Sequence, residues 1–377
     1  MNQNLVAGEA KRASRSASRL AYFDVAEFIA IVAVIVGHTA LRFVDSSLSR
    51  QAIAVTFSFH LPLFFIVDGF FLHVDRPFGA RESFRRLGVP YVVTAVAVVI
   101  LAAVTNLILK DQGSTKALIV SWANAAIFGA GDLVSNPLWP QSMRIGAIWF
   151  LLALFWCRLF VASAYRTPCP WLVVFVYFIV GYVSVRWVFL PLSIQPALCA
   201  SLFMYVGTLA RRGNWFGDGS VSRFERAIVV LLWAFAMAGA TGFGMAVNSY
   251  GIYATDVVRN IVGGVAGTWC VIVGCRAIEL KTPFGGGSLW RLVSRLGELS
   301  LLILCVHLVE DNVVRWEAIA LATKGVTGTG PGWLLVLFAR LVVDVFMALV
   351  LARVPLVCKV FGVRSAEGEA GDAHDNR

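Results

Sequence analysis

Long apolar stretches separated by short polar segments run along almost the whole chain. A helix needs about 20 mostly apolar residues to cross a bilayer, and the stretches reach that length again and again. They predict an all-α fold, a polytopic transmembrane bundle of about ten helices. A weaker stretch, 117–131, is too short to span and is expected to be a re-entrant or interfacial piece. The ten windows are 21–42, 53–74, 88–109, 145–164, 170–188, 194–211, 227–247, 256–278, 297–315 and 332–357.

The composition supports the same class. Of the 377 residues, 59% are hydrophobic and only 14% are charged, whereas soluble domains carry about 25% charged residues. The seven cysteines form no CxxC pair and mostly fall within apolar windows. They are therefore interpreted as small packing residues rather than as disulfides or metal ligands.

The net charge of +10 follows membrane topology rather than a nucleic-acid surface. Most of the 32 Lys and Arg lie in alternate polar segments, starting with the N-terminal one. Because cytoplasmic loops carry the excess of positive charge, both termini are predicted to be cytoplasmic. The protein itself is predicted to lie in the inner cell membrane. The lipid bilayer is thus a predicted partner, and nucleic acid is not.

The chain divides into one membrane domain and two tails. Residues 1–19 are predicted to be a basic cytoplasmic tail, 20–361 the transmembrane domain, and 362–377 a disordered cytoplasmic tail rich in small and charged residues. No internal repeat is evident, which weakens a reading as a secondary transporter.

Three ionisable residues occur in the first predicted span. Asp24 and Glu27 stand near its start, and His38 follows a glycine near its end. Glu27 and His38 are about three turns apart, so they share a face at opposite depths. Ionisable groups in a span commonly line a polar cavity. His38 could take a proton from a hydroxyl; the alternative is an interfacial histidine that faces water.

The second span carries His60 near its start, Pro62 two residues later, and Asp68 deeper along it. Proline opens or kinks a helix at this point. His60 is expected at the depth of His38, as a site residue or as an interfacial cap. Asp68 stands in an apolar run where an unpaired carboxylate is costly, so a site role is predicted.

The last two predicted spans contain two further pairs. His307 and Glu310 are three residues apart and therefore share a helix face; a carboxylate there could fix the imidazole tautomer, or the pair could be a polar helix end. Arg340 and Asp344 are four apart, which favours an ion pair within one helix.

Arg85 and Arg86 form a basic pair between the second and third windows. Two interpretations remain open. The pair could reflect the positive-inside rule alone, or it could contact a phosphate or nucleotide.

Taken in order along the chain, these segments resemble the acyltransferase 3 family of integral membrane O-acyltransferases, and most closely the branch related to fucose 4-O-acetylases. No one motif is specific alone, but the ordered set is. It consists of Asp24 through Gly37-His38; Phe59-His60-Leu61-Pro62-Leu63-Phe64-Phe65 with Gly69-Phe70; Arg85-Arg86-Leu87 with Pro90-Tyr91; Ile148-Trp149-Phe150-Leu151; Phe203 through Gly207 before Arg211-Arg212; and Leu296-Gly297 with Ser300-Leu301 and His307.

The resemblance implies an O-acyltransferase that moves an acyl group, commonly acetyl, from acetyl-CoA or another acyl-CoA to a sugar hydroxyl of a surface glycan or its lipid-linked precursor. It implies His38 as general base or acyl-carrying nucleophile, and Arg85 and Arg86 as contacts of the CoA phosphates. No metal is expected. The residues implied at the substrates are Asp24, Glu27, His60, Asp68, Trp149, His307 and Glu310.

Two positions depart from the family pattern. The family has arginine or lysine 11 residues before the first-span histidine, where this chain has Glu27, and serine before the second-span glycine, where it has Asp68. The two changes could compensate each other at the donor site. Two other functions also remain open: a transporter or flippase for a polar lipid or sugar, and a non-catalytic partner in glycan assembly.

Overall fold

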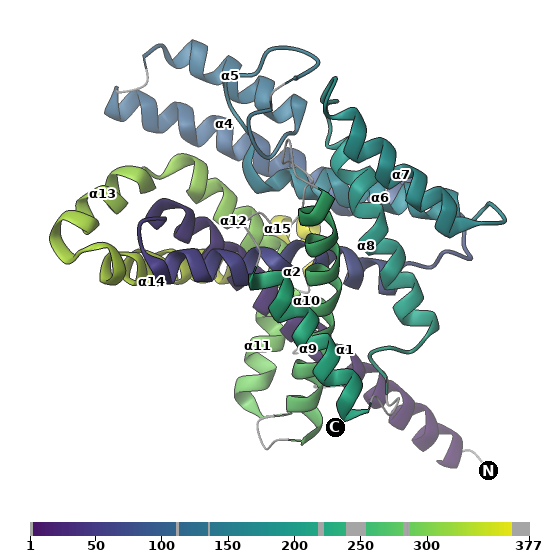
Figure 1. The fold of residues 1–377 in the computed structure, drawn as a ribbon. Coiled ribbons are helices and arrows are strands. Elements are labelled where there is room, and N and C mark those ends of the chain that lie inside the picture. The colour runs from purple at the N-terminus through teal and green to yellow at the C-terminus, as the bar shows by residue number, and fades with distance from the viewer. Residues whose placement is uncertain are drawn as a thin grey trace.

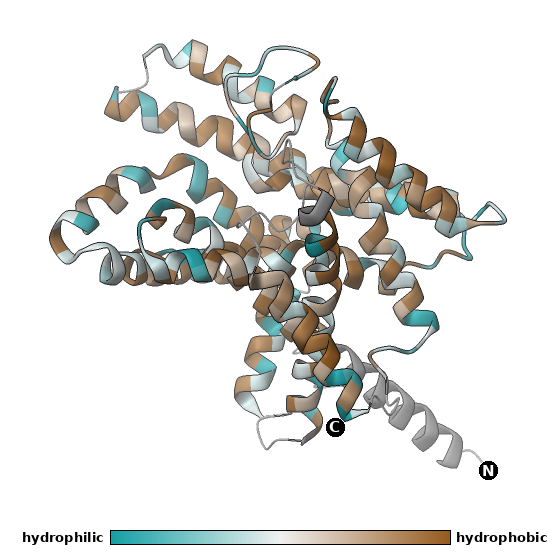
Figure 2. Cartoon of the chain, viewed as in Figure 1, coloured by the Kyte–Doolittle hydropathy of each residue, from teal (hydrophilic) through white to brown (hydrophobic). Residues whose placement is uncertain are grey.

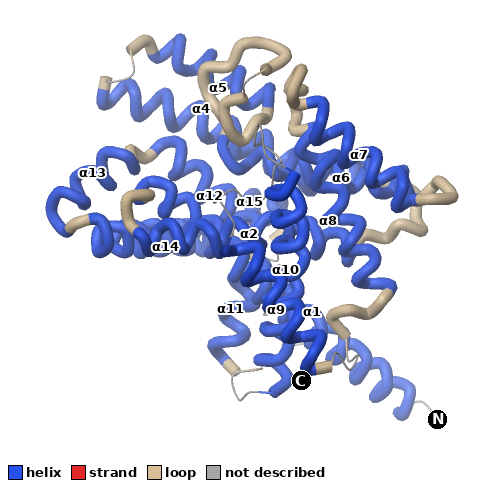
Figure 3. The backbone as a smooth tube through the Cα atoms, in the orientation of Figure 1, coloured by secondary structure: helices blue, strands red, loops and turns tan. Residues whose placement is uncertain are grey.

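The computed structural model describes residues 3–110, 113–134, 136–217, 222–238, 254–281, 285 and 287–363. The predicted fold class is confirmed, because this part of the chain consists of helices without a β-strand (Figure 3). One isolated bridge joins Pro137 to Phe189 across two loops. The C-terminal tail beyond residue 363 lies outside the described residues.

Figure 1 shows how the helices are arranged. In chain order they are α1 (Gln3–Ala40), α2 (Ser47–Phe71), α3 (Ala80–Ser83), α4 (Val89–Leu109), α5 (Thr115–Phe128), α6 (Trp149–Ala164), α7 (Pro170–Ser184), α8 (Ile194–Arg212), α9 (Arg223–Ala238), α10 (Ala254–Lys281), α11 (Ser288–Glu298), α12 (Ser300–Val313), α13 (Trp316–Thr327), α14 (Thr329–Leu351) and α15 (Pro355–Phe361). Short 3₁₀ segments extend α1 and precede α6, and a π-helical turn, Phe84–Gly88, joins α3 to α4.

Six helices in the described part of the chain are long and apolar enough to cross a membrane, and a bent pair, α11 with α12, makes a seventh candidate. The protein is thus a multi-pass membrane protein. Two of the other windows correspond to α7, a shorter apolar helix, and to α8. The window 227–247 begins in α9 and continues into residues 239–253, which lie outside the described residues. The number of about ten spans and the cytoplasmic termini stay predictions.

The structure differs from the sequence-based expectation near the C-terminal end. The window 297–315 is not one straight helix, because α11 and α12 meet at Leu299 with a bend of 63°. Gly297, just before the bend, packs directly on the backbone carbonyl of Asp24, where any Cβ would clash. This close approach lays α11 along α1. The segment after α12, which lies between the last two predicted windows, forms α13.

The bundle has a buried centre and a lipid-facing perimeter. α2 packs against α1, α8 and α10, while α1 also packs against α11. The apolar window of α2 is 61% buried, but that of α14 is only 22% buried. Figure 2 shows apolar residues along these outer helices, and Phe338 on α14 is 67% exposed. Such a surface suits contact with lipid, because hydrocarbon tails surround apolar side chains favourably and the backbone groups of a helix are hydrogen-bonded within it.

Candidate functional site

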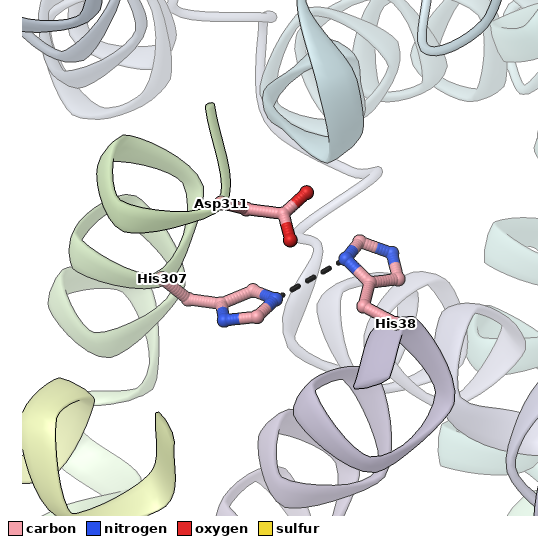
Figure 4. Close-up of side chains that lie close together, drawn as sticks. All are labelled: His38, His307 and Asp311. Atoms are coloured by element: carbon pink, nitrogen blue, oxygen red, sulfur yellow. Dashed lines mark hydrogen bonds between the residues drawn. The ribbon is translucent and has the colours of Figure 1, made fainter. Parts of the chain in front are cut away.

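Two histidines from opposite ends of the chain meet near the end of α1. His38 Nδ1 lies 3.1 Å from His307 Nε2, and the two rings are tilted by 38° (Figure 4). His38 comes from the last turn of α1, and His307 comes from the middle of α12. The packing of α12 against α1 thus brings together two residues that the sequence places 269 positions apart.

Two carboxylates hold the far side of the His307 ring. Asp344 Oδ2, on α14, and Glu310 Oε1, one turn further along α12, each lie 2.9 Å from His307 Nδ1. The side chains of His307 and Asp344 are fully buried. The result is a continuous chain of contacts, Asp344–His307–His38.

The predicted ion pair between Arg340 and Asp344 is wrong. The guanidinium of Arg340 turns to α12, where Nε and Nη2 donate to Glu310 Oε1 at 2.9 and 2.7 Å and Nη2 also reaches Asp311. Asp344 contacts His307 instead, through its Oδ2. A planar guanidinium is stabilised more by charge-assisted hydrogen bonds to two carboxylates on a facing helix than by one carboxylate on its own helix. The indole N–H of Trp316 also donates to Glu310.

Arg42, one turn beyond His38, ties the end of α1 to the same cluster. It donates to the His38 backbone carbonyl and to Asp311, both at 2.9 Å, and lies 3.5 Å from Glu317. This links the backbone at His38 to α12 and to the start of α13. The position of the His38 ring is therefore fixed from its backbone as well as from its side chain.

We call the ionised residues around His307 the charge cluster. It contains three carboxylates and two guanidiniums, which leaves one negative charge in a buried region. A single proton held on the two imidazoles would neutralise it. Burial of unpaired charge is expensive, so the charge cluster favours the imidazolium that forms when His38 accepts a proton. The members of the charge cluster are Arg42, Glu310, Asp311, Arg340 and Asp344.

The ligand types would also suit a cation. One nitrogen each of His38 and His307 and an oxygen of Asp311 lie within 4.8 Å of one another, and a second such group joins His307, Glu310 and Asp344. Imidazole nitrogen and carboxylate oxygen are common zinc ligands. However, Asp311 already accepts from two arginines, which oppose a dication. The expectation of no metal stays a prediction.

His38 opens onto a cavity of about 510 Å³, which we call the His38 cavity. His38 is the imidazole that lines it, and since its Nδ1 faces His307, its Nε2 is the nitrogen left for a ligand. The charged and polar lining consists of His38, Arg42, Arg144, Asp311, Glu317 and Lys324.

This arrangement suits proton transfer. If His307 donates from Nδ1 to the carboxylates, its Nε2 accepts the Nδ1–H of His38, and His38 Nε2 then carries a free lone pair. A base oriented by a second group that is itself oriented by a carboxylate is the arrangement found in acyl-transferring enzymes. The positions of the ring protons on His38 and His307 are inferred from their hydrogen-bond partners.

A second cavity, of about 430 Å³, lies toward the other end of the apolar span Ala21–Phe43, and we call it the Glu27 cavity. Glu27 accepts a hydrogen bond of 3.2 Å from Ser300. Asp24 lies beside it and accepts one of 3.2 Å from Ser294 on α11. The charged and polar residues that line the cavity are Glu27, Asp68, His73, Arg76, Glu82, Arg86, Arg158, Ser83 and Ser300.

Asp68 is not an isolated charge. Arg158, on α6, donates from Nε to Asp68 Oδ2 at 2.7 Å, and its Nη2 reaches the other carboxylate oxygen. Both side chains are largely buried, at 13% and 16% exposure. A two-point contact of this kind offsets the cost of placing a carboxylate within a span.

Comparison with known proteins identifies the kind of enzyme. The sequence model for an acyltransferase domain matches residues 20–352, which is most of the chain. The chain belongs to the acyltransferase 3 family. It is therefore a membrane acyltransferase. No curated protein and no solved structure gives a match, and the closer resemblance to fucose 4-O-acetylases stays a prediction.

Some residues predicted at the acyltransferase site lie elsewhere. His60 is 2% exposed, contacts the Thr56 carbonyl of its own helix through Nδ1, and lines neither cavity. Trp149 is 4% exposed at the start of α6 and also lines neither. Arg86 lines the Glu27 cavity, whereas its exposed neighbour Arg85 does not. Buried packing explains the first two positions without a ligand.

Three charged residues that contact predicted site residues or their partners were not among the residues predicted from the sequence. Arg42 and Arg158 were counted as loop charges, yet they contact Asp311 and Asp68. Asp311 likewise has no predicted role. A spacing signal existed, because Arg42 follows His38 by four residues and Asp311 follows His307 by four. Each histidine thus has a charged residue on its own helix face, one turn further along.

Proposed function

We propose that this acyltransferase moves an acyl group, in particular acetyl, from acyl-CoA to a sugar hydroxyl of a surface glycan or its lipid-linked precursor. The observation that carries the proposal is the Asp344–His307–His38 chain opening onto a cavity of about 510 Å³. A sugar hydroxyl is a weak nucleophile until a base takes its proton. The arrangement supplies such a base in a cavity of ligand size.

The donor binds at the Glu27 cavity. Its mouth carries Arg76 and Arg86, and cationic side chains suit the phosphates of CoA. The loop between α2 and α4 that bears them is the one for which the distribution of Lys and Arg predicts the cytoplasmic side, where acyl-CoA is made. The protein then lies in the cytoplasmic membrane with its His38 cavity facing outward.

Chemistry occurs at His38. Its Nε2 accepts the proton of the sugar hydroxyl while the hydroxyl oxygen attacks the thioester carbonyl carbon. The new C–O ester bond forms, the C–S bond breaks, and the sulfur of CoA leaves and takes up that proton from His38 Nε2, which regenerates the base. His307 and Asp344 stabilise the positive charge that develops on His38.

The two cavities imply that the acyl group crosses much of the membrane. Glu27 and His38 are 11 residues apart on α1, or about 16 Å along the helix axis. The long flexible arm of CoA, entering from the Glu27 cavity, is the carrier we propose for this distance. The phosphates then stay with the arginines while the thioester approaches His38.

The test uses the purified chain in lipid vesicles with labelled acetyl-CoA and a glycan acceptor. We expect acceptor-dependent release of CoA and an alkali-labile acetyl ester on the sugar, both absent from His38→Ala protein of the same thermal stability. Release of CoA without an acceptor ester would contradict the glycan proposal. Full transfer by His38→Ala would contradict the role of His38.

A further inference from the structure

We infer that the His38 cavity recognises an acceptor sugar that carries an anionic group, a carboxylate or a phosphate, through Arg144. The inference rests on the proposed function, because it names the class of its acceptor. It starts from the charges that line the cavity. Three cationic side chains, Arg42, Arg144 and Lys324, face two carboxylates, Asp311 and Glu317.

Most of these charges already have partners. Arg42 contacts both Asp311 and Glu317, and the buried Arg340 shares Asp311 as well. Lys324 Nζ lies 3.4 Å from Asp45 and 5.0 Å above the Phe43 ring. Each carboxylate of the cavity thus contacts an arginine other than Arg144.

Arg144 is different. Its side chain is exposed, and within the part of the chain that the structure describes, neither a hydrogen bond nor an ion pair engages it. It lines the His38 cavity and also a neighbouring cavity of about 330 Å³ that shares Arg42, Asp311 and Glu317. Arg144 therefore stands where the two spaces meet, with its guanidinium free for a ligand.

The backbone holds Arg144 in this place. The next residue, Ile145, donates to the Ala130 carbonyl at 3.1 Å, and its own carbonyl accepts from Asn312 at 3.5 Å. Gly146 follows with a φ of +73°, a conformation that favours glycine. Since Asn312 is adjacent to Asp311 on α12, Arg144 is positioned against the helix that carries His307.

A second observation points the same way. Arg42 lines the cavity beside Arg144, and its buried Nε has no hydrogen-bond partner among the described residues. A buried donor without a partner is unfavourable, so Arg42 has hydrogen-bonding capacity that Asp311 and Glu317 do not use. Arginine forks bind carboxylate and phosphate in two-point geometry, which also orients the ligand. A sugar anchored in this way would present a neighbouring hydroxyl to His38.

The test is direct binding, which does not depend on catalysis. Saturation-transfer NMR with the detergent-purified chain compares methyl β-glucuronide, glucose 6-phosphate and methyl β-glucoside. We expect at least one anionic sugar to bind about tenfold more tightly than the neutral one, as for a charge-assisted hydrogen bond. The stronger of the two anions identifies the group. Equal binding of all three sugars would overturn the inference.

Two matched variants complete the test. Arg144→Gln is expected to remove the preference for the anion, whereas Arg186→Gln, an exposed arginine that lines neither cavity, keeps it. A preference that survives Arg144→Gln would also overturn the inference. A parallel transfer assay separates the two proposals. Anion preference without any acyl transfer would contradict the proposed function alone, and acyl transfer without anion preference would contradict only this inference.

Discussion

The two charged regions of the bundle compensate their buried charges in different ways. At the His38 end, three carboxylates, two arginines and two imidazoles are joined by contacts among α1 with its 3₁₀ extension, α12 and α14. At the Glu27 end, Asp68 and Arg158 form one pair, and Glu27 has a single hydrogen bond from Ser300. The first region is arranged to hold a ring and a proton in place, and the second leaves charged groups available to a ligand that enters and leaves.

This contrast suggests a division of labour along α1. A site that transfers a proton needs fixed geometry, because small displacements lower the rate strongly. A site that binds a substrate reversibly needs accessible charge and space. Substitutions at the His38 end should therefore change turnover, and those at the Glu27 end should change donor affinity or local stability.

The largest effect is expected for His38→Ala. Removal of the general base should lower kcat about a thousandfold, without unfolding the protein, because His38 is only half-buried at a cavity. His60→Ala is the matched control, and we expect a far smaller loss of kcat because His60 lines neither cavity. Steady-state acyl transfer in vesicles measures both. Equal losses would remove the distinction between the two histidines.

Asp344→Asn should lower kcat about a hundredfold, because an amide cannot hold the His307 tautomer as a carboxylate does. The side chain keeps its size, so the melting temperature should change little. The dependence of kcat on pH should change as well, which a purely structural role for Asp344 would not produce. An unchanged kcat and pH profile would show that the contact with His307 is not used.

The pair Asp68 and Arg158 should behave as a structural unit. Asp68→Asn alone is expected to destabilise the fold by about 3 kcal/mol, because it leaves the arginine charge unmatched in a span. Arg158→Met alone should cost a similar amount, and the double variant clearly less than the sum. Unfolding in mixed micelles measures the cycle. Additive effects would mean that the two side chains act independently.

The smallest effect separates two neighbouring arginines. Arg86→Gln should raise the KM for acetyl-CoA about tenfold, the size expected for one charged contact, and leave kcat unchanged. Arg85→Gln is the matched control, since Arg85 is exposed but lines neither cavity. If both variants raise KM equally, the pair acts as a diffuse basic surface rather than through one contact.

Hydropathy located the spans well because the bilayer fixes their length and requires backbone N–H and C=O groups to form hydrogen bonds within each helix. The window 21–42 corresponds to the span Ala21–Phe43, and 145–164 to Gly146–Ala164. Hydropathy could not show the 63° bend between α11 and α12, which depends on the contact of Gly297 with α1.

The site was predicted only in part. His38, His307 and Glu310 do come together, and ionisable residues in apolar windows were sufficient to single them out. The partners were harder to find, because spacing within one helix favours a local pair such as Arg340 with Asp344. Packing instead offered Arg340 two carboxylates on a facing helix. Such choices depend on tertiary contacts that spacing alone does not contain.

The central claim is that donor binding and proton transfer occur toward opposite ends of the span Ala21–Phe43. The measurement that tests it most directly compares labelled acetyl-CoA binding and acyl transfer for His38→Ala and Arg86→Gln in the same vesicles. We predict that His38→Ala binds the donor normally and fails to transfer, while Arg86→Gln binds the donor weakly and reaches normal turnover at saturation. Loss of donor binding in His38→Ala, or loss of turnover at saturating donor in Arg86→Gln, would contradict that separation.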